Sequence, residues 1–574
     1  MENSRLSKMV IAAVAFSIAS AIGLPAQTFT QVVSFDVANG ASPQSALIQA
    51  TDGNFYGTAA AGGPNQGCGS SFGCGTVFQV TPAGTQASFY SFCSQPNCAD
   101  GAFPVAGLIQ GTDGNFYGTT ASGGTSSNCD LGCGTVFQIT LAGALTTLHS
   151  FSGPDGAEPF AGSLIYGTDG NFYGTTAAGG ANGNYGTIFN ITPSGTLTTL
   201  YSFCSQPGCS DGYAPYSGLV LGADGNFYGT TYAGGTYTDG TAFVFNPTTG
   251  TLTTLYSFCS QSNCADGNGP YGGLIQGTDG NFYGTTEIGG ANDNGTVFQL
   301  NTGTAPPTLT TLYSFSGPDG KFPQAGVIQA SDGNFYGVTI EGGANSDGTA
   351  FAITLTGTLT TLYSFCSQPG CTDGQNPYGA LVQVSNGTFY GTTYYGGTST
   401  DCYSSGCGTL FNLSVGLAPF VETQLASGLV GSSVTILGNG LAGSTSVSFN
   451  GTAAKFTAKN SEIKTKLPLA ATTGKIIVTT AKGGTLHTSV PFRVRPQIKK
   501  FSPAKGPAGQ QVEITGVSLS QTSKVSFGAV AAEFEVKSDT EVTATVPIGA
   551  KTGKITITTA GGVASTAKTF VVTE

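Results

Sequence analysis

Short segments in which apolar and polar residues alternate recur along almost the whole chain. Residues 197–203, Leu-Thr-Thr-Leu-Tyr-Ser-Phe, form one such segment, and residues 186–192, Gly-Thr-Ile-Phe-Asn-Ile-Thr, form another. Alternation bounded by Gly, Pro, Asn and Asp is typical of half-buried β-strands, and no segment after about residue 30 has the spacing of an amphipathic helix. The pattern predicts an all-β protein.

These segments form a repeat of four predicted strands. In the third copy the strands span residues 162–167, 171–177, 186–192 and 197–203. The second strand carries Asp-Gly-Asn-Phe-Tyr-Gly-Thr-Thr or a close variant. Its tyrosine recurs in steps of 61, 56, 55, 55, 53 and 54 residues, at Tyr56, Tyr117, Tyr173, Tyr228, Tyr283, Tyr336 and Tyr390. A regular period with four short strands per copy is typical of β-propeller blades.

The two ends of the repeat array complement each other. A fourth-strand segment that ends at Phe35 precedes the first complete set, and the last repeat stops after its third strand, residues 408–414. The N-terminal strand can therefore complete the last blade, which removes an open sheet edge. The sequence predicts a seven-bladed β-propeller closed by the N-terminal strand; eight blades and an open array are the alternatives.

The repeated Asp-Gly-Asn-Phe-Tyr motif has a structural interpretation. An Asp-Gly pair between two strands favours a two-residue type I′ turn. The Phe and Tyr that follow point to opposite faces of the second strand, where both would pack between neighbouring blades. The glycine after Tyr would let the next blade approach closely. Repeated copies of one acid do not supply an acid and a base with distinct roles, so we interpret the motif as architecture.

With these motifs, the region from about residue 28 to residue 413 resembles the GloVer tandem-repeat proteins. Their repeats carry the Asp-Gly-Asn-Phe-Tyr-Gly-Thr-Thr sequence, a Gly-Gly pair, Gly-Thr-Val-Phe and Leu-Thr-Thr-Leu-Tyr-Ser-Phe, all of which occur here. These relatives are bacterial extracytoplasmic proteins. The resemblance implies export and surface display, and it assigns no catalytic residue.

A second repeat begins after Pro419, where cysteines disappear and lysines become common. Residues 431–451 align with residues 509–529, and both copies alternate in the manner of strands with Gly and Pro turns. The second copy carries Phe501-Ser502-Pro503 and Gly506, and so resembles IPT/TIG domains; the first copy lacks the Phe-Ser-Pro. The resemblance implies two immunoglobulin-like β-sandwiches, which serve bacterial surface proteins as spacers or adhesive modules.

The predicted organisation is a signal peptide at residues 1–26, the propeller at 27–416, a first IPT/TIG-like domain at 417–495 and a second at 496–574. Arg5 and Lys8 precede a short apolar core, which is typical of a secretory signal peptide cleaved after Ala26 or Ala21. An uncleaved anchor helix is the alternative, although the core is short for a span of about 20 residues. We expect no transmembrane segment after cleavage.

Charge is divided unevenly along the chain. Residues 27–422 hold 22 acidic residues against one basic residue, Lys321, a charge of −21, whereas residues 423–574 hold 16 basic and 7 acidic residues, a charge of +9. Nucleic acid needs many Lys or Arg contacts to phosphate, so no nucleic-acid partner is expected for the acidic region. The basic residues of the tail are scattered through strand-like sequence, and we interpret them as a solvated surface.

All 14 cysteines lie in the acidic region and form close pairs. An even count, close pairing and a signal peptide together predict disulfides formed outside the cytoplasm. The predicted pairs are Cys68/Cys74, Cys93/Cys98, Cys129/Cys133, Cys204/Cys209, Cys259/Cys264, Cys366/Cys371 and Cys402/Cys407. Two repeats replace the cysteine loop by the shorter Phe-Ser-Gly-Pro-Asp-Gly, so the pairs are interpreted as staples of long loops rather than as zinc ligands.

The cysteine pairs and most of the length variation fall in loops that should share one face of the propeller, which marks this variable-loop face as the candidate binding face. The loops before each first strand end in an aspartate in six repeats: Asp100, Asp155, Asp211, Asp266, Asp319 and Asp373. A ring of carboxylates could bind Ca²⁺; the alternative is that each aspartate serves its own Asp-Gly turn. No other cofactor is expected.

A second candidate set on this face is aromatic. The residue after the loop proline is Phe160, Tyr216, Tyr271 or Tyr378 in four repeats, and Gln44, Val105 or Gln324 in the others. Aromatic rings at the mouth of a central channel could stack on sugar rings. The alternative is that they pack under the stapled loops.

The sequence favours a secreted or surface-displayed, non-catalytic binding or adhesion protein whose partner is a glycan or a protein. A carbohydrate-active enzyme using carboxylates on the same face is one alternative, with Glu287 and Glu341 as the conceivable pair. A purely structural matrix protein is the other. His149 occupies the tyrosine position of a fourth strand and is interpreted as a packing variant.

Overall fold

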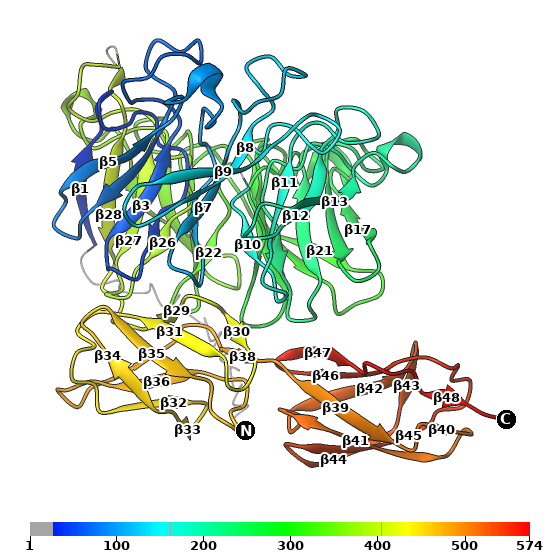
Figure 1. The fold of residues 1–574 in the computed structure, drawn as a ribbon. Coiled ribbons are helices and arrows are strands. Elements are labelled where there is room, and N and C mark those ends of the chain that lie inside the picture. The colour runs from blue at the N-terminus through cyan, green and yellow to red at the C-terminus, as the bar shows by residue number, and fades with distance from the viewer. Residues whose placement is uncertain (1–26, 161, 403–404) are drawn as a thin grey trace, which may run out of the picture.

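The computed structural model describes residues 27–160, 162–402 and 405–574 (Figure 1). The predicted signal peptide, with its cleavage sites at Ala21 and Ala26, lies outside the described residues. Within them the fold is all-β, as predicted, and none of their helices could cross a membrane. The helical segments of the described residues are four 3-10 turns: η1 (Pro96–Cys98), η2 (Pro207–Cys209), η3 (Ser262–Cys264) and η4 (Pro369–Cys371).

The described strands of the repeat region form seven antiparallel sheets of four strands each. The first strands of these sheets are β2 (Ile48–Gln49), β6 (Ile109–Gln110), β10 (Ile165–Tyr166), β14 (Val220–Leu221), β18 (Ile275–Gln276), β22 (Ile328–Gln329) and β26 (Val382–Gln383). The second strands are β3 (Phe55–Ala59), β7 (Phe116–Thr120), β11 (Phe172–Thr176), β15 (Phe227–Thr231), β19 (Phe282–Thr286), β23 (Phe335–Thr339) and β27 (Phe389–Thr393). Every second strand is fully buried, because sheets pack against both of its faces.

The outer half of each sheet completes the predicted four-strand unit. The third strands are β4 (Thr76–Val80), β8 (Thr135–Ile139), β12 (Thr187–Ile191), β16 (Thr241–Asn246), β20 (Thr296–Asn301), β24 (Thr349–Ile353) and β28 (Thr409–Ser414). The fourth strands are β5 (Gln86–Ser91), β9 (Leu145–Ser150), β13 (Leu197–Ser202), β17 (Thr251–Ser257), β21 (Thr308–Ser314), β25 (Leu359–Ser364) and β1 (Thr28–Ser34).

The N-terminal strand belongs to the last sheet. β1 pairs antiparallel with β28, from Thr28 opposite Ser414 to Ser34 opposite Thr409. This pairing brings the first strand of the repeat region beside its last strand. Phe29 of β1 also stacks on Tyr363 of the neighbouring sheet, with ring centroids 3.8 Å apart. The prediction that this strand supplies the missing fourth strand of the last repeat is confirmed.

Aromatic contacts link each sheet to the next and the last sheet back to the first. In each case the motif tyrosine of one second strand meets the phenylalanine that precedes the tyrosine of the next. The ring centroids are between 4.0 and 4.5 Å apart, at Tyr56–Phe116, Tyr117–Phe172, Tyr173–Phe227, Tyr228–Phe282, Tyr283–Phe335, Tyr336–Phe389 and Tyr390–Phe55. The Phe and Tyr of the motif therefore pack on opposite neighbours, as their alternation predicts.

The turn in the motif is not the predicted type I′. In the second sheet the loop between the first two strands runs from Gly111 to Asn115, whose backbone groups pair at 2.8 Å, and the Gly114 N–H donates to the Gly111 carbonyl at 3.0 Å. Only Gly114 has a positive φ, of 86°, whereas a type I′ turn also needs one at Asp113. A five-residue loop leaves room for side-chain hydrogen bonds that a two-residue turn could not hold.

Those hydrogen bonds explain why Asp, Asn and Tyr recur together. One Asp113 carboxylate oxygen accepts from the Asn115 backbone N–H at 3.1 Å, and the other accepts from the Asn115 amide at 2.7 Å and the Tyr117 hydroxyl at 2.8 Å. Gln138 of the third strand donates to the same hydroxyl at 2.7 Å. The aspartate thus closes its own turn and fixes the tyrosine that packs on the next sheet.

The glycine after the tyrosine is needed for a different reason from the one predicted. A Cβ at Gly118 would lie 2.7 Å from the ring of Phe137 and 2.9 Å from Leu108, both of which belong to the same sheet. The same arrangement recurs in the other sheets. The glycine therefore makes room for the phenylalanine opposite it on the third strand, not for the neighbouring sheet.

Two further units follow the repeat region, and their strands pair identically. The first contains β29 (Glu422–Thr423), β30 (Ser427–Gly428), β31 (Ser433–Leu437), β32 (Ser446–Phe449), β33 (Thr452–Ala453), β34 (Phe456–Ala458), β35 (Glu462–Lys466), β36 (Ile476–Thr479), β37 (Thr485–His487) and β38 (Arg493–Val494). Its four-stranded sheets, β29-β31-β35-β34 and β33-β32-β36-β37, enclose one apolar core.

The second unit repeats this plan. It contains β39 (Gln497–Ser502), β40 (Lys505–Gly506), β41 (Gln511–Val517), β42 (Thr522–Phe527), β43 (Val530–Ala532), β44 (Phe534–Ser538), β45 (Glu541–Thr545), β46 (Ile555–Thr559), β47 (Gly562–Ser565) and β48 (Val571–Val572). The sheets are β39-β41-β45-β44 and β43-β42-β46-β47. The 78-residue offset between the two copies thus reflects one sandwich topology used twice.

The first of these sandwiches lies against the loops that join first to second strands, which we call the turn side of the repeat region (Figure 1). Side-chain hydrogen bonds across this contact include Gln424 to the Gly111 carbonyl at 2.8 Å, Arg495 to the Thr168 carbonyl at 2.9 Å, Asn439 to the Ser385 hydroxyl at 2.9 Å, Ser461 to the Thr51 carbonyl at 3.3 Å and Arg493 to the Leu221 carbonyl at 3.4 Å. They reach the turns or first-strand ends of five different sheets, so the sandwich covers much of this side.

Candidate ligand-binding site

The loops at the opposite end of the sheets, which we call the loop side, carry the cysteines. All seven predicted pairs are disulfide-bonded, and none of the described cysteines is free. Among the described residues, three clusters bring a carboxylate or a cysteine close enough to two further cysteines to share an ion, but in each cluster two of the cysteines are disulfide-bonded to each other. Cysteine binds a metal as a thiolate, and a disulfide-bonded cysteine has no thiolate, so these clusters do not favour a metal site.

Two of these staples also contribute to the apolar cores between sheets, through Cys133 and Cys407. Both are bonded as predicted, to Cys129 and Cys402, but both are also fully buried members of the apolar cores between sheets. The reason is their position, because each stands two residues before a third strand, β8 or β28. These two cysteines therefore belong to the core of the repeat region and not to its ligand-accessible surface.

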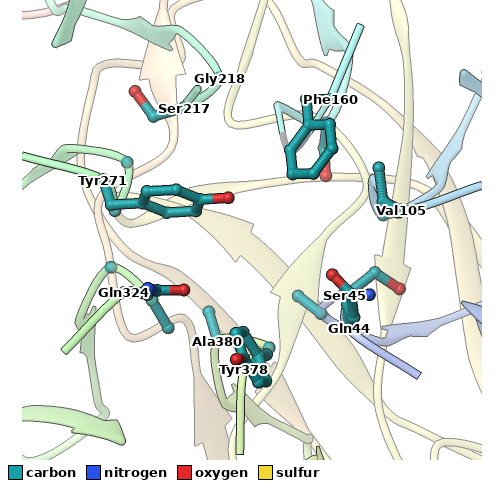
Figure 2. Close-up of a pocket in the computed structure, with 18 of the residues that line it drawn as sticks. Gln44, Ser45, Val105, Phe160, Ser217, Gly218, Tyr271, Gln324, Tyr378 and Ala380 are labelled. Atoms are coloured by element: carbon teal, nitrogen blue, oxygen red, sulfur yellow. The ribbon is translucent and has the colours of Figure 1, made fainter. Parts of the chain in front are cut away.

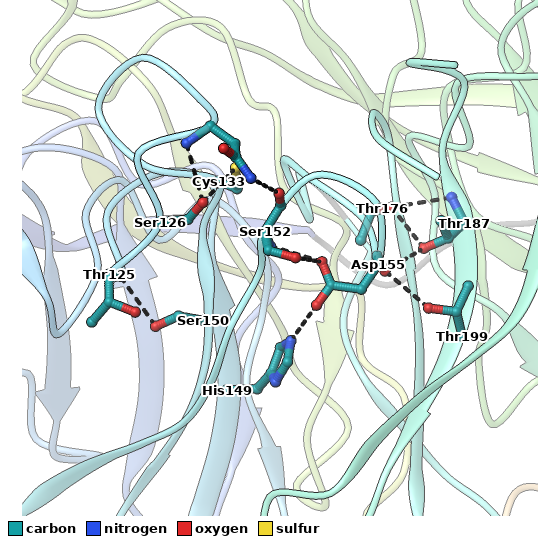
Figure 3. A network of polar contacts seen from close by, with 11 residues as sticks. Thr125, Ser126, Cys133, His149, Ser150, Ser152, Asp155, Thr176, Thr187 and Thr199 are labelled. Carbon is teal, nitrogen blue, oxygen red and sulfur yellow. Dashed lines mark hydrogen bonds and ion pairs between the residues drawn. The ribbon is translucent and has the colours of Figure 1, made fainter. Parts of the chain in front are cut away.

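The sulfur atoms of these two cysteines also have polar neighbours in their own loops. The Cys133 Sγ lies 3.7 Å from the Ser126 hydroxyl (Figure 3), and the Cys407 Sγ lies 3.7 Å from the Ser399 hydroxyl. A disulfide sulfur carries no proton, so it can only accept in these contacts and the serine hydroxyl must donate. Each bond thus ties the start of its loop to the buried end.

Each long stapled loop closes around its aspartate. In the first of them one Asp100 oxygen accepts from the Tyr90 hydroxyl at 2.8 Å and from the backbone and side chain of Ser94, both at 2.9 Å, while the other accepts from the Gln95 N–H at 3.1 Å. Asp211, Asp266 and Asp373 have equivalent partners. All four are at most 3% exposed. The staple therefore holds in place the loop that supplies these donors.

The two short loops bind their aspartates with fewer donors. His149 replaces the tyrosine in one of them, and its Nε2 lies 2.8 Å from Asp155, which also accepts from the backbone and side chain of Ser152 at 2.7 and 2.8 Å (Figure 3). Burial alone would raise the pKa of Asp155, but the hydrogen bonds from His149 and Ser152 outweigh it and lower the pKa. Asp319 accepts from Tyr313 at 2.5 Å.

These contacts bear on the predicted calcium ring. In all six positions the carboxylate accepts a hydrogen bond from a serine N–H of its own loop, which is what the turn alternative requires. An ion would have to displace those donors. Calcium binding by Asp100, Asp155, Asp211, Asp266, Asp319 and Asp373 stays a prediction, and the geometry favours the turn role.

The aromatic candidates lie around one central cavity. Its volume is about 240 Å³, and all seven sheets contribute to its lining through the residues at or just before their first strands. Figure 2 shows Phe160, Tyr271 and Tyr378 around this space together with Gln44 and Gln324, and the Tyr271 ring extends across it. None of the lining residues is charged.

Tyr216 does not line the cavity itself but supports one side of it. Its ring stacks on Tyr271 with centroids 5.1 Å apart and an angle of 16°, and it meets Phe160 edge-on at 5.7 Å. Tyr232 packs against both tyrosines, at 5.4 and 6.0 Å. All four rings remain partly exposed, so they form a continuous aromatic surface rather than a core covered by the loops.

A carboxylate stands beside this surface. Glu287 accepts from the Gln324 amide at 2.6 Å and from the Tyr232 hydroxyl. Burial, followed by the charge and hydrogen bond of Glu287, raises the pKa of Tyr232 to about 12. Burial and the neighbouring Tyr216 likewise raise the pKa of Tyr271. The hydroxyls are therefore protonated at neutral pH and can donate hydrogen bonds.

A second, larger cavity adjoins the first. Its volume is about 560 Å³, and it shares Gln44, Val105 and Phe160 with the central one. Tyr394 and Tyr395 line its other side, and Tyr394 also contacts Tyr378 at 5.2 Å. The remaining lining residues are mostly Ala and Ser, and none of the residues that line it is charged. The two cavities together offer an uncharged, aromatic path from the centre outward.

The carboxylates of the enzyme alternative have separate partners. Glu287 is held by Gln324 and Tyr232, whereas Glu341 lies 3.6 Å from Lys321. Lys321 is the single Lys or Arg of the acidic region, and it forms its ion pair with Glu341. Glu341 therefore has a structural partner of its own, separate from those of Glu287. His149, likewise, is occupied by Asp155.

Sequence reasoning missed three features of this region. It did not connect Gln324 with Glu287, although it named Glu287 as one carboxylate of the enzyme alternative. It gave no indication of the second cavity, because that space depends on how loops of different repeats meet. It also missed the contact of Arg493 and Arg495 with the turn side, although these are the only arginines after Arg5 and stand out in a tail of lysines.

The chain matches the Gloeobacter/Verrucomicrobia repeat family over residues 67–265 and 260–453, more than half of its length, and belongs to that family. Residues 496–572 match the IPT/TIG domain. The suspected combination of repeat and domain is confirmed. The match to the domain covers the second sandwich, and the first shares its strand pairing. No curated protein matches the chain.

Several solved structures resemble this chain at low sequence identity and low TM-score. A fungal alcohol oxidase of the AA5 family, in complex with copper, is 13% identical over 95% of this chain and 99% of its own, with a TM-score of 0.39. TolB from Acinetobacter baumannii is 15% identical over 50% of this chain and 60% of its own, with a TM-score of 0.31. The surface glycan-binding protein PbSGBP-B from Prevotella bryantii is 18% identical over 25% of this chain and 38% of its own, with a TM-score of 0.21. At these TM-scores the likenesses carry no argument about ligand or chemistry.

Proposed function

We propose that residues 27–416 form a closed seven-bladed β-propeller that binds a neutral oligosaccharide at its loop side, in a protein that is secreted or displayed on the cell surface. Residues 417–495 and 496–574 are the two immunoglobulin-like domains that follow it. Seven disulfides staple the loops. Disulfides form and persist in oxidising compartments outside the cytoplasm, so these bonds support the extracytoplasmic location. The cycle of Tyr–Phe contacts, which returns from Tyr390 to Phe55, supports closure.

The observation that carries the binding proposal is the uncharged aromatic lining of the central cavity. Phe160, Tyr271 and Tyr378 offer ring faces to the apolar faces of sugars, and the amides of Gln44 and Gln324 offer hydrogen bonds to hydroxyls. A charged ligand would enter a region of charge −21 without a basic partner in the lining. A neutral sugar suits both the lining and the surrounding charge.

The two cavities suggest how a chain would lie. A space of about 240 Å³ is below the usual range of about 300–1,000 Å³ for ligand pockets, so the central cavity suits a terminal sugar. The adjoining cavity, of about 560 Å³, would take the units that follow. Binding without turnover is favoured over hydrolysis because Glu287 and Glu341 are each engaged by separate partners.

The proposal is tested by applying purified residues 27–574 to a broad glycan array, with and without Ca²⁺. We expect retention on neutral glycans that is lost when Tyr216, Tyr271 and Tyr378 are changed to Ala. Tyr237→Ala is the matched control, because this tyrosine is 47% exposed and lines neither cavity. Absence of retention under both conditions would contradict the proposal. Release of sugar products that depends on Glu287 would establish the enzyme alternative instead.

A further inference from the structure

The first sandwich presents exposed lysines on one face of a sheet. In β35 the burial alternates, so that Ile463 and Thr465 point into the core while Lys464 and Lys466 are exposed on the same outer face. Residues two apart on a strand are separated by about 6.8 Å. The two ammonium groups therefore extend from neighbouring positions of one sheet face.

The strand register adds hydroxyl groups to both lysines. Lys466 lies opposite Ser433 and Lys464 lies opposite Thr435 of β31, while Thr457 of β34 faces Lys464 from the other side. If the β34–β35 pairing is continued by one residue, Lys455 lies opposite Lys466. The Thr465 hydroxyl donates to the Lys455 carbonyl at 2.8 Å, which holds Lys455 beside β35. Two rows of polar side chains thus cross three adjacent strands, which are labelled in Figure 1.

These residues line a groove rather than a flat surface. Its volume is about 820 Å³, and Thr112 of the turn side forms part of its wall. Three lysines and no carboxylates are among its lining residues. The Lys464 Nζ lies 3.9 Å from the Glu462 Oε2. Glu462 makes a shorter ion pair with Lys459, whose Nζ lies 2.8 Å from its Oε1. Among the described residues, Lys455 and Lys466 take part in no ion pair.

We propose that this groove binds a linear anionic polysaccharide that carries carboxylates, such as a polyuronate. Lysine ammonium groups provide point charges for carboxylates, and the Ser and Thr hydroxyls can hydrogen-bond sugar hydroxyls. Three lysines are few for a nucleic acid, which is bound through many phosphate contacts. The site is separate from the uncharged cavity of the loop side, so one molecule would hold a neutral and an acidic glycan on different faces.

The test uses immobilised polygalacturonate and three forms of the full chain. The groove variant carries Lys455→Gln, Lys464→Gln and Lys466→Gln. The control variant carries Lys551→Gln, Lys554→Gln and Lys568→Gln, which removes the same charge from exposed positions of the second sandwich. Thermal unfolding checks that both variants keep the wild-type stability.

We expect the wild type and the control variant to bind at low ionic strength and to elute as salt is raised, since exposed charges are screened. The groove variant should lose at least about tenfold in affinity, because all three charges of the proposed site are removed. Equal losses in both variants, or unchanged binding by the groove variant, would overturn the proposal. Single-stranded DNA that binds more tightly than polygalacturonate, with the same dependence on the three lysines, would overturn the choice of ligand.

Discussion

The turn side and the loop side of the repeat region use the same residue types in different ways. On the turn side, Asp113 and its equivalents close short loops that hardly vary, and the first sandwich packs over them. On the loop side, Asp100 and its equivalents organise long loops that vary in length and carry disulfides. On both sides the aspartate accepts hydrogen bonds from its own loop, and on the loop side partly exposed aromatic residues line a central cavity.

This difference shows that repetition alone does not mark a site. The motif tyrosines, such as Tyr117, are buried and repeat without exception, because each one packs between two sheets. The residues around the cavity differ from repeat to repeat, from Gln44 to Tyr271. These positions can differ between repeats because they face the cavity instead of packing between sheets. Such differences would let seven similar sheets present different side chains to one ligand.

The largest predicted effect concerns the seam between the chain ends. Phe35, at the end of β1, and Phe203, at the equivalent position of an uninterrupted repeat, are both fully buried. If β1 is a full member of its sheet, Phe35→Ala and Phe203→Ala should each lower the free energy of unfolding by about 3–5 kcal/mol. Denaturant unfolding measures both. A loss below about 1 kcal/mol for Phe35→Ala alone would mean that the seam contributes little.

A smaller effect is expected from filling the space beside a second strand. Gly118→Ala would place a Cβ 2.7 Å from the Phe137 ring and should cost about 1–3 kcal/mol through overpacking. In a Phe137→Leu background the added methyl group should cost less, since the ring tip is gone. A double-mutant cycle measures this coupling. A cost that is unchanged in that background would contradict packing within the sheet.

The hydrogen bonds of the turn side should contribute less again. Tyr117→Phe removes the hydroxyl that donates to Asp113 and accepts from Gln138, at an expected cost of about 1 kcal/mol. The seventh repeat offers a natural control, because Asn386 replaces the aspartate there and leaves Tyr390 without that acceptor. Tyr390→Phe should therefore shift the urea midpoint less than Tyr117→Phe. A larger shift for Tyr390→Phe would refute the role given to the aspartate.

The smallest effect is expected from metal removal. Because the loop-side aspartates accept hydrogen bonds from their own loops, EDTA should leave the unfolding temperature unchanged, and added Ca²⁺ should not raise it. A fall on chelation that calcium reverses would instead establish the calcium ring.

The sequence predicted those parts of the structure that depend on local pattern. Strand order, the pairing of β1 with β28 and the partners of all 14 cysteines follow from alternation, period and spacing. The sequence placed Phe160, Tyr271 and Tyr378 at equivalent positions of their repeats, and the structure brings these three residues to one cavity. The turn type and the role of Gly118 did not follow from the sequence, because both depend on side chains brought together across strands.

Contacts between distant segments were beyond the sequence for the same reason. Nothing in the local pattern brings Gln324 to Glu287, or Arg495 to the Thr168 carbonyl. The burial of Cys133 between two sheets likewise depends on residues of the next repeat. The lysines of the tail were interpreted as a scattered solvated surface, yet the register of β34 and β35 gathers three of them in one groove. Such groups appear only once the strands are placed side by side.

The most direct test of the account is a calorimetric titration with the neutral glycan that the array identifies. The account predicts that Tyr271→Ala, on the loop side, abolishes the binding heat, while Gln424→Ala, which removes a contact of the first sandwich with the turn side, leaves the affinity at the wild-type value. Both variants should unfold at temperatures close to that of the wild type, which excludes a general loss of structure. Unchanged affinity in Tyr271→Ala, or a loss confined to Gln424→Ala, would contradict the assignment of ligand binding to the loop side.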